Sequence, residues 1–265
     1  MSESWPPLDA HAHIEPGIDP TELLPLRAAI FAATRTLEEF ETTLGRADPI
    51  AVWGVGVHPK VPAAFETFSI ERFERSIDRS PLVSEVGLDR TSSVPMSTQG
   101  HVLAQILRSL RGRPRIVSMH SVGATAEVLD LIEEHAPVGV VLHWWRGTEA
   151  QTARALELGC RFSINRSDSR RPAVIGRVPA NRILTETDYP HGSGPRSVPG
   201  DVGTVEEALA EHSQVTVDQV RRTVWANLAA LVAETDTWAF FVDPLHRTLT
   251  IAHGIDRTRV RRADA

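Results

Sequence analysis

The sequence predicts an α/β protein of the (β/α)8 TIM-barrel class. Eight short apolar runs rich in β-branched residues recur along the chain, each bounded by residues that break strands. Stretches with apolar spacing of three and four, typical of amphipathic helices, lie between most of these runs. Parallel strands need crossover helices, and eight strand and helix pairs can close, so an alternation over roughly 200 residues favours a barrel over a doubly wound sheet.

The elements follow one another in regular order. The expected strands are Leu8–His13, Ala28–Thr34, Ile50–Val57, Leu82–Leu88, Arg115–His120, Val138–His143, Cys160–Asn165 and Arg182–Thr187. The expected helices between them are Thr36–Arg46, Ser69–Asp78, His101–Leu110, Ala124–His135 and Glu149–Leu158. Capping boxes are predicted at Thr36/Glu39 and at the start of two last helices that cover the barrel, with the pairs Thr204/Glu207 and Thr216/Gln219.

The domain organisation predicted is one barrel over residues 1–234 and a C-terminal extension over residues 235–265. The pattern weakens after Glu234 and ends in a cluster of arginines. We interpret the extension as a partly mobile tail with a solvated cationic end, and contact of this tail with nucleic acid is the alternative.

The composition excludes several classes of protein. A content of 42% apolar residues supplies a core, and a net charge of −6 excludes a histone-like binder of nucleic acid. Cys160 is the only cysteine, which excludes a disulfide framework and a cysteine-based zinc site. The N-terminus has no basic stretch followed by an apolar core, and no run of about 18 uncharged apolar residues occurs. We therefore expect a soluble cytoplasmic protein without membrane contact.

Residues that can bind a metal fall at the ends of the expected strands, where barrel enzymes place their chemistry. His11 and His13 lie two apart on the first strand, so both imidazoles share one face. The remaining candidates lie late in or just after the fourth, fifth, sixth and eighth strands, and they are Glu85, His120, His143 and Asp188. Six ligands exceed what one zinc ion uses, so we predict two divalent cations with Glu85 as the bridge.

The type of metal stays open at this stage. A carboxylated lysine bridge is disfavoured because Lys60, the only lysine, follows the third strand, whereas the fourth strand carries Glu85. Imidazole and carboxylate ligands together suit Zn²⁺, Mn²⁺, Fe²⁺ or Mg²⁺.

These residues carry a resemblance to a known family. His11-Ala12-His13, Gly56-Val57-His58-Pro59, Glu85-Val86-Gly87-Leu88-Asp89, His120-Ser121, His143 with Gly147, Glu186-Thr187-Asp188-Tyr189-Pro190 and Asn227 occur in order. The ordered set resembles the TatD family of metal-dependent deoxyribonucleases of the amidohydrolase superfamily. The resemblance implies hydrolysis of phosphodiester bonds in DNA, often exonucleolytic. It also implies that His11, His13, Glu85 and Asp188 hold one metal and that Glu85, His120 and His143 hold the other.

The chain departs from the family pattern at two loops. His120-Ser121-Val122 lacks an arginine that the family usually has, and His143-Trp144-Trp145-Arg146-Gly147 replaces the usual His-x-Phe-Ser-Gly. Candidates for substrate binding are His58, Arg90, Trp144, Arg146 and Arg196, with arginines binding phosphate and Trp144 or Trp145 stacking on bases; solvated arginines and a packed tryptophan are the alternatives. The TatD-like component of the Qat anti-phage system, with partners in a defence complex, is one divergent subgroup to consider.

The expected mechanism is hydrolysis by water activated between two metals, with Asp188 as the base and Glu85 as the catalytic bridge. Pure ligation by Asp188 is the alternative. Two other functions remain open: a small-molecule hydrolase of the same superfamily, and a non-catalytic scaffold. The DNA or RNA preference, the polarity of digestion and the oligomeric state are not determined by the sequence.

Overall fold

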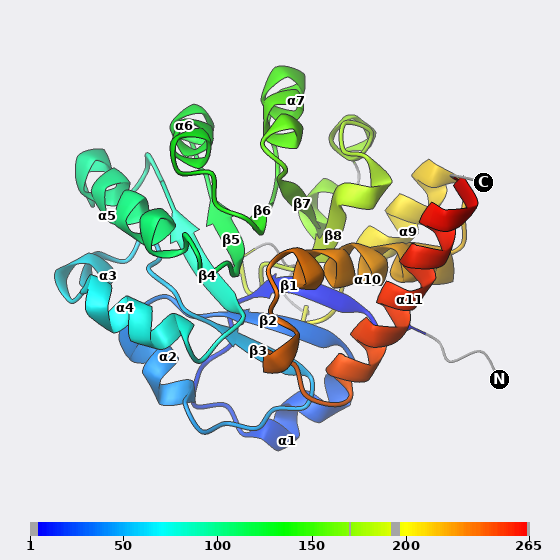
Figure 1. Cartoon of the computed structure of the whole chain (residues 1–265), viewed down its shortest axis with the longest axis horizontal. Coiled ribbons are helices and arrows are strands. Elements are labelled where there is room, and N and C mark those ends of the chain that lie inside the picture. Colours follow the sequence, from blue (N-terminus) through cyan, green and yellow to red (C-terminus); the bar gives the residue numbers. More distant parts are fainter. Residues whose placement is uncertain (1–4, 170, 192–196, 264–265) are drawn as a thin grey trace.

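In the part of the chain that the structure describes, eight strands form the centre and helices surround them (Figure 1). The computed structural model describes residues 5–169, 171–191 and 197–263. The strands are β1 (Leu8–Ala12), β2 (Ala29–Ala33), β3 (Ala51–Gly54), β4 (Leu82–Gly87), β5 (Ile116–His120), β6 (Val140–Leu142), β7 (Arg161–Asn165) and β8 (Ile183–Glu186). Each lies within one of the predicted runs, so the sequence prediction of the strands is confirmed.

The strands run parallel in chain order, as a TIM barrel requires. They form two hydrogen-bonded groups, β1-β2-β3 and β4-β5-β6-β7-β8. A parallel bridge between Val55 and Val83 joins the groups on one side. On the other side the segments that follow β1 and β8 bond to each other, because the Asp188 amide donates to the His11 carbonyl at 2.9 Å and the His13 amide donates to the Tyr189 carbonyl at 2.7 Å. The second seam is therefore made outside a regular ladder, and it lies next to candidate ligands.

The longer helices match the predicted positions, with some different ends. They are α2 (Leu37–Thr43), α4 (Ile70–Ile77), α5 (Met96–Ser109), α6 (Thr125–His135), α7 (Glu149–Glu157), α9 (Gly203–Ser213) and α10 (Val217–Glu234). The shorter helices, which the sequence did not indicate, are α1 (Pro20–Leu23), α3 (Pro62–Glu66) and α8 (Pro172–Ile175). Helix α5 begins five residues before the predicted start, since the turn Met96–Gly100 is helical although Met96, which packs on the core, is its only large apolar residue.

Only one of the three predicted capping boxes forms completely. At α10 the Thr216 hydroxyl and the Gln219 side chain each accept the other residue's backbone N–H. At α2 the Thr36 hydroxyl accepts from the Glu39 amide, but the Glu39 carboxylate accepts from the Arg35 amide instead. Helix α9 begins after Val202 without a side-chain cap, so the prediction of a box at Thr204 is wrong.

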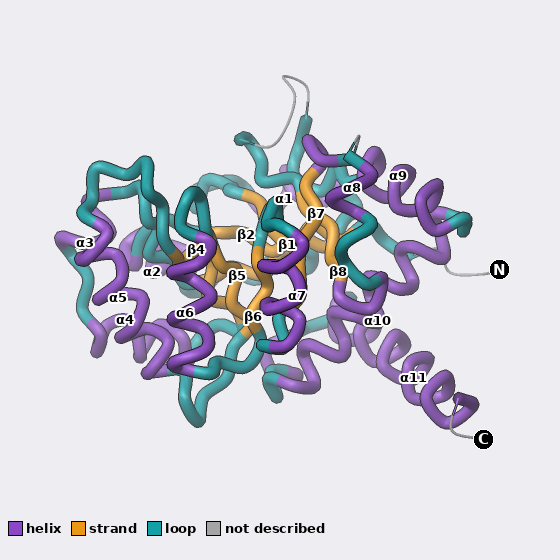
Figure 2. The backbone as a smooth tube through the Cα atoms, turned by 90° about the horizontal axis from the view of Figure 1, so that it is seen from above, coloured by secondary structure: helices purple, strands orange, loops and turns teal. Residues whose placement is uncertain are grey.

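The C-terminal extension contains a further helix, α11 (Leu245–Ala263), which packs on α10 and extends beyond it (Figure 2). Leu245, Leu249 and Ala252 on this helix are buried. These three residues are spaced by four and three, so they share one face of α11, and this face packs the first half of the extension against the barrel domain. None of the helices in the described ranges combines the length and the apolar character of a membrane span.

Candidate metal centre

The structure brings all six predicted ligands together at one end of the strands. His11 lies in β1 and His13 directly follows that strand, while Glu85 lies in β4. His120 ends β5, His143 follows β6, and Asp188 comes two residues after β8. All six side chains are buried. The carboxyl ends of the strands therefore form one deep cluster of imidazoles and carboxylates.

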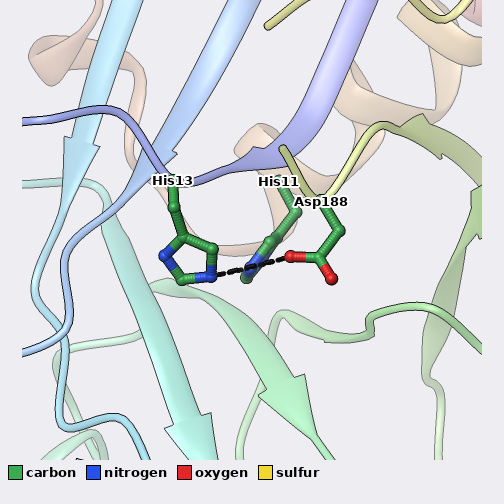
Figure 3. Close-up of side chains that lie close together, drawn as sticks. All are labelled: His11, His13 and Asp188. Atoms are coloured by element: carbon green, nitrogen blue, oxygen red, sulfur yellow. Dashed lines mark hydrogen bonds and ion pairs between the residues drawn. The ribbon is translucent and has the colours of Figure 1, made fainter. Parts of the chain in front are cut away.

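One part of the cluster is formed by His11, His13 and Asp188, whose side chains turn toward one another (Figure 3). The Asp188 Oδ1 atom lies 3.8 Å from His11 Nε2 and 3.6 Å from His13 Nε2. Glu85 Oε2 approaches the same two nitrogens, at 3.4 Å and 3.2 Å. Two imidazole nitrogens and two carboxylate oxygens thus surround one point, which is a ligand set that suits a divalent cation.

A second part lies around the other oxygen of Glu85. The Oε1 atom is 2.5 Å from His120 Nδ1 and 2.8 Å from His143 Nε2. These two nitrogens are 3.2 Å apart. Each oxygen of the Glu85 carboxylate therefore faces a separate set of ligand atoms, which is the arrangement that a bridging carboxylate requires.

Unsatisfied buried atoms show that the cluster fits a cation. Glu85 Oε2 is buried and accepts no hydrogen bond of good geometry from the described residues, although three imidazole nitrogens lie within 3.4 Å of it. The Nε2 atoms of His11 and His13 face each other at 3.4 Å, where two N–H groups would repel. Burial lowers the pKa of His11 to about 4, so this imidazole is neutral and can donate a lone pair to a metal.

The charge of Glu85 dominates the electrostatics. Burial opposes ionisation of this carboxyl, but the facing charges of His58, His143 and His120 hold its pKa well below the usual range. Burial alone would lower the pKa of His143, and the neighbouring Glu85 carboxylate raises it well above the usual value. Burial raises the pKa of Asp188 to about 7, and the charge of Glu85 acts in the same direction. The ionised Glu85 carboxylate is therefore the group to which the surrounding imidazoles respond, and a bound cation would take the place of their protons.

Several residues that hold the ligands were missed by the sequence analysis. His11 Nδ1 lies 2.7 Å from the Ser118 hydroxyl, and His120 Nε2 lies 2.8 Å from Asp89 Oδ2. Such contacts orient an imidazole toward a metal. Asp89 stands at the end of the motif that begins at Glu85, so its position was a signal. Asp9 is buried in β1 and accepts hydrogen bonds from the Thr187 amide and hydroxyl, which fixes the segment that leads to Asp188.

A cavity of about 730 Å³ opens above the centre and includes five of the six ligands in its lining. His58 also lines it, with Nε2 at 3.2 Å from Glu85 Oε2. The Lys60 amide donates to His58 Nδ1 at 3.0 Å, so Nδ1 is the acceptor and Nε2, which faces the cavity, is the nitrogen that carries hydrogen. His58 is therefore arranged to donate a hydrogen bond into the site.

The remaining substrate-binding candidates have different environments. Trp144 and Arg146 line the cavity. Arg90 instead donates to the Gly123 carbonyl and pairs with Glu127 on α6, and it is not among the residues that line the cavity. Arg196 lies outside the described residues.

The two adjacent tryptophans have separate positions. Trp145 is buried, packs on Phe162 with ring centroids 5.3 Å apart and donates to the Thr152 hydroxyl. The structure therefore assigns the packed position to Trp145 and leaves only Trp144 at the cavity.

Comparison with known proteins adds a family relationship to this geometry. The family model described as TatD related DNase matches residues 8–233, which include the whole ligand cluster. A "3'-5' ssDNA/RNA exonuclease TatD" from Cronobacter turicensis is 32% identical over 150 residues, covering 51% of this chain and 56% of that protein. Another, from Edwardsiella piscicida, is 32% identical over 183 residues, covering 63% and 69%. The match thus spans little more than half of the first relative.

Similarity to solved structures supports the fold. YJJV, a TatD homolog from Escherichia coli, superposes with a TM-score of 0.73 at 21% identity, covering 84% of this chain and 96% of that one. At this identity the likeness concerns the fold alone. The barrel predicted from the sequence is confirmed by this match and by the parallel strands.

Proposed function

The chain belongs to the TatD related DNase family, and from this premise we propose that it is a metal-dependent hydrolase that cleaves phosphodiester bonds in single-stranded DNA. His11, His13, Glu85 and Asp188 would hold one divalent cation. His120 and His143 would hold a second one together with Glu85. Zn²⁺, Mn²⁺, Mg²⁺ and Fe²⁺ all suit this ligand set.

The observation that carries the proposal is that the two carboxylate oxygens of Glu85 face different pairs of histidines. Its Oε2 atom is within 3.4 Å of His11 and His13, and its Oε1 atom is within 2.8 Å of His120 and His143. A site for one cation would need only one of these sets. The arrangement supports two cations, which together would supply positive charge to phosphoryl oxygens and would lower the pKa of a water molecule to near neutrality.

The residues of the chain then have distinct roles. Asp188 accepts the proton of the attacking water, because its carboxylate lies at the cavity and beside the first ligand set. His58 donates from Nε2 to a phosphoryl oxygen, since its Nδ1 atom is occupied by the Lys60 amide. Glu85 contributes one oxygen to each of the two ligand sets and so links them.

The cavity rim supports a nucleic-acid substrate. Arg35, Lys60 and Arg146 line it around the cluster of imidazoles and carboxylates. Lys60 is exposed and forms no ion pair with any residue that the structure describes, so its ammonium group is available to a phosphate. Trp144 adds an aromatic ring suited to stacking on a base. Two relatives are named as 3'-5' exonucleases of single-stranded DNA or RNA, which agrees with a substrate whose 3' end enters the cavity.

The proposal is tested with purified protein and oligonucleotides labelled at either end. We expect single-stranded DNA to be cleaved in the presence of added divalent metal and to remain intact with EDTA. The value of kcat/KM should fall as salt is added, because phosphate contacts are screened. Cleavage that resists EDTA would contradict metal dependence. Turnover of amides, lactones or phosphate monoesters without nuclease activity would favour the small-molecule hydrolase, and binding without turnover would favour the scaffold.

Three finer expectations accompany this function as proposals. The active barrel spans residues 1–234, with 235–265 as an appendage. The protein acts in the cytoplasm, and no membrane is involved. The relation to a defence system and to its protein partners stays a prediction, which co-purification from the native host would test.

A further inference from the structure

The buried carboxylate of Asp168 accepts hydrogen bonds from two residues that line the cavity, Trp144 and Arg146. Asp168, at the end of the short helix Arg166–Asp168 that follows β7, has an exposed fraction of 1%. Its Oδ2 atom accepts from Trp144 Nε1 at 2.8 Å and from Arg146 Nε at 2.9 Å. Arg146 Nη2 donates to the neighbouring Ser167 hydroxyl at 3.0 Å. The indole and the guanidinium are therefore held by one short segment from the next strand and loop.

The two held side chains also contact each other. The guanidinium carbon of Arg146 lies 4.7 Å from the centre of the Trp144 ring, in a cation–π contact. Trp144 has a φ of 43°, a left-handed conformation that bulky residues rarely adopt. Conformations of this kind persist where the surroundings hold them, and they concentrate at functional sites. Here the hydrogen bond to Asp168 holds the indole in place.

The arrangement leaves binding capacity toward the cavity. Trp144 and Arg146 both line the cavity above the metal centre, together with His120 and His143. The Arg146 side chain is 45% exposed, and its Nη1 group makes no hydrogen bond to any residue in the described part of the chain. An aromatic ring beside an available guanidinium donor suits one nucleotide, with its base on the ring and its phosphate on the arginine.

The same three residue types meet once more, away from the site. Asp48 Oδ2 accepts from Trp53 Nε1 at 2.7 Å and from Arg46 Nε at 2.7 Å, and Arg46 lies 5.0 Å from the centre of the Trp53 ring. Arg46 and Asp48 precede β3 and Trp53 lies within it, and none of the three lines the cavity above the metal centre. The contacts of this cluster hold the barrel together and do not face the cavity. A change at Asp48 therefore serves as a matched control for a change at Asp168.

We propose that Asp168 is a positioning residue that presets Trp144 and Arg146 as a binding platform for one nucleotide of single-stranded nucleic acid. The inference rests on the proposed function. Because both side chains are already ordered, the substrate does not bear the entropy loss of ordering them. Loss of Asp168 should therefore weaken substrate binding while the chemistry at Glu85 and Asp188 continues.

The test compares Asp168→Ala and Asp168→Asn with the control Asp48→Asn. Binding of a fluorescein-labelled oligothymidylate is measured by anisotropy in EDTA, and kcat and KM are measured with metal. We expect Asp168→Ala to raise Kd and KM roughly tenfold, equivalent to about 1.4 kcal/mol, with kcat within about threefold of the parent. Asp168→Asn keeps an oxygen that can accept from the indole, so its Kd and KM should lie between those of the parent and those of Asp168→Ala. Asp48→Asn should lower the melting temperature and leave Kd unchanged.

Two further measurements separate positioning from a general structural role. With an abasic oligonucleotide the effect of Asp168→Ala should shrink, because no base stacks on Trp144. In the double variant of Asp168→Ala with Arg146→Ala, the second change should add little to the first, since the pair acts as a unit.

The outcomes distinguish this inference from the function on which it rests. A parent protein that cleaves no nucleic acid contradicts the proposed function. A parent that cleaves, with folded Asp168 variants that bind oligothymidylate as tightly as the parent, contradicts only the platform. Fully additive effects of Asp168→Ala and Arg146→Ala would also overturn it.

Discussion

Replacing Asp188 with asparagine separates metal binding from proton transfer. Asparagine keeps an oxygen at the Oδ1 position, which lies 3.6 Å from His13 Nε2 and 3.8 Å from His11 Nε2, but it accepts no proton at neutral pH. The three other ligands of this set remain. The variant should therefore retain most of its metal and lose the base.

The backbone at this position makes asparagine the right substitution. Asp188 has a φ of 48°, in the left-handed region. Asparagine adopts this region at least as readily as aspartate, whereas alanine there would add a strain of roughly 1–2 kcal/mol. Asp236, which has a φ of 50° and lies exposed after α10, provides the matched control. Asp236→Asn repeats the chemical change in the same backbone conformation, away from the ligands.

General base catalysis is worth roughly 10²- to 10⁴-fold, so we expect kcat of Asp188→Asn to fall by about 10²-fold or more with KM little changed. The assay is cleavage of labelled single-stranded DNA at saturating substrate, with the metal content of each sample measured by elemental mass spectrometry. Asp236→Asn should retain the parent kcat. A kcat for Asp188→Asn within about threefold of the parent, at equal metal content, would refute the base role and leave Asp188 as a ligand only.

Three other predictions concern the metals and the fold. Native mass spectrometry should find about two divalent ions per chain and a loss of both in Glu85→Ala, because its two oxygens face both ligand sets; a parent with at most one ion under every metal would exclude the bridge. Cys160 is buried and burial raises its pKa to about 12, so iodoacetamide should label it only in denaturant, and rapid labelling of the folded protein would show local opening there. Thr216→Ala should lower the free energy of unfolding in urea by about 1 kcal/mol through loss of the α10 cap, whereas Thr204→Ala, which removes no cap, should change it by less than about 0.5 kcal/mol.

Local patterns in the sequence determined the strands and the place of the ligands. All strands of a TIM barrel are parallel, so the carboxyl end of each apolar run lies at the same rim of the barrel. The sequence therefore places His11, Glu85 and His120 at one rim without knowledge of any contact between them. The capping box at Thr216 followed from residues three positions apart for the same reason. Periodicity and spacing report interactions between near neighbours, and these elements depend on such interactions.

The tertiary structure alone decided which oxygen of Glu85 meets which histidines, because that depends on how β1, β4, β5 and β6 lie relative to one another. It also decided that Arg90 pairs with Glu127 on α6 and that Asp168, 24 residues from Trp144, holds the cavity rim. An arginine after a strand has the same local pattern whether it faces a substrate or a neighbouring helix. Which carboxylate lies within reach of the arginine depends on how segments distant in sequence pack together. The residues near the arginine in the sequence do not determine this packing.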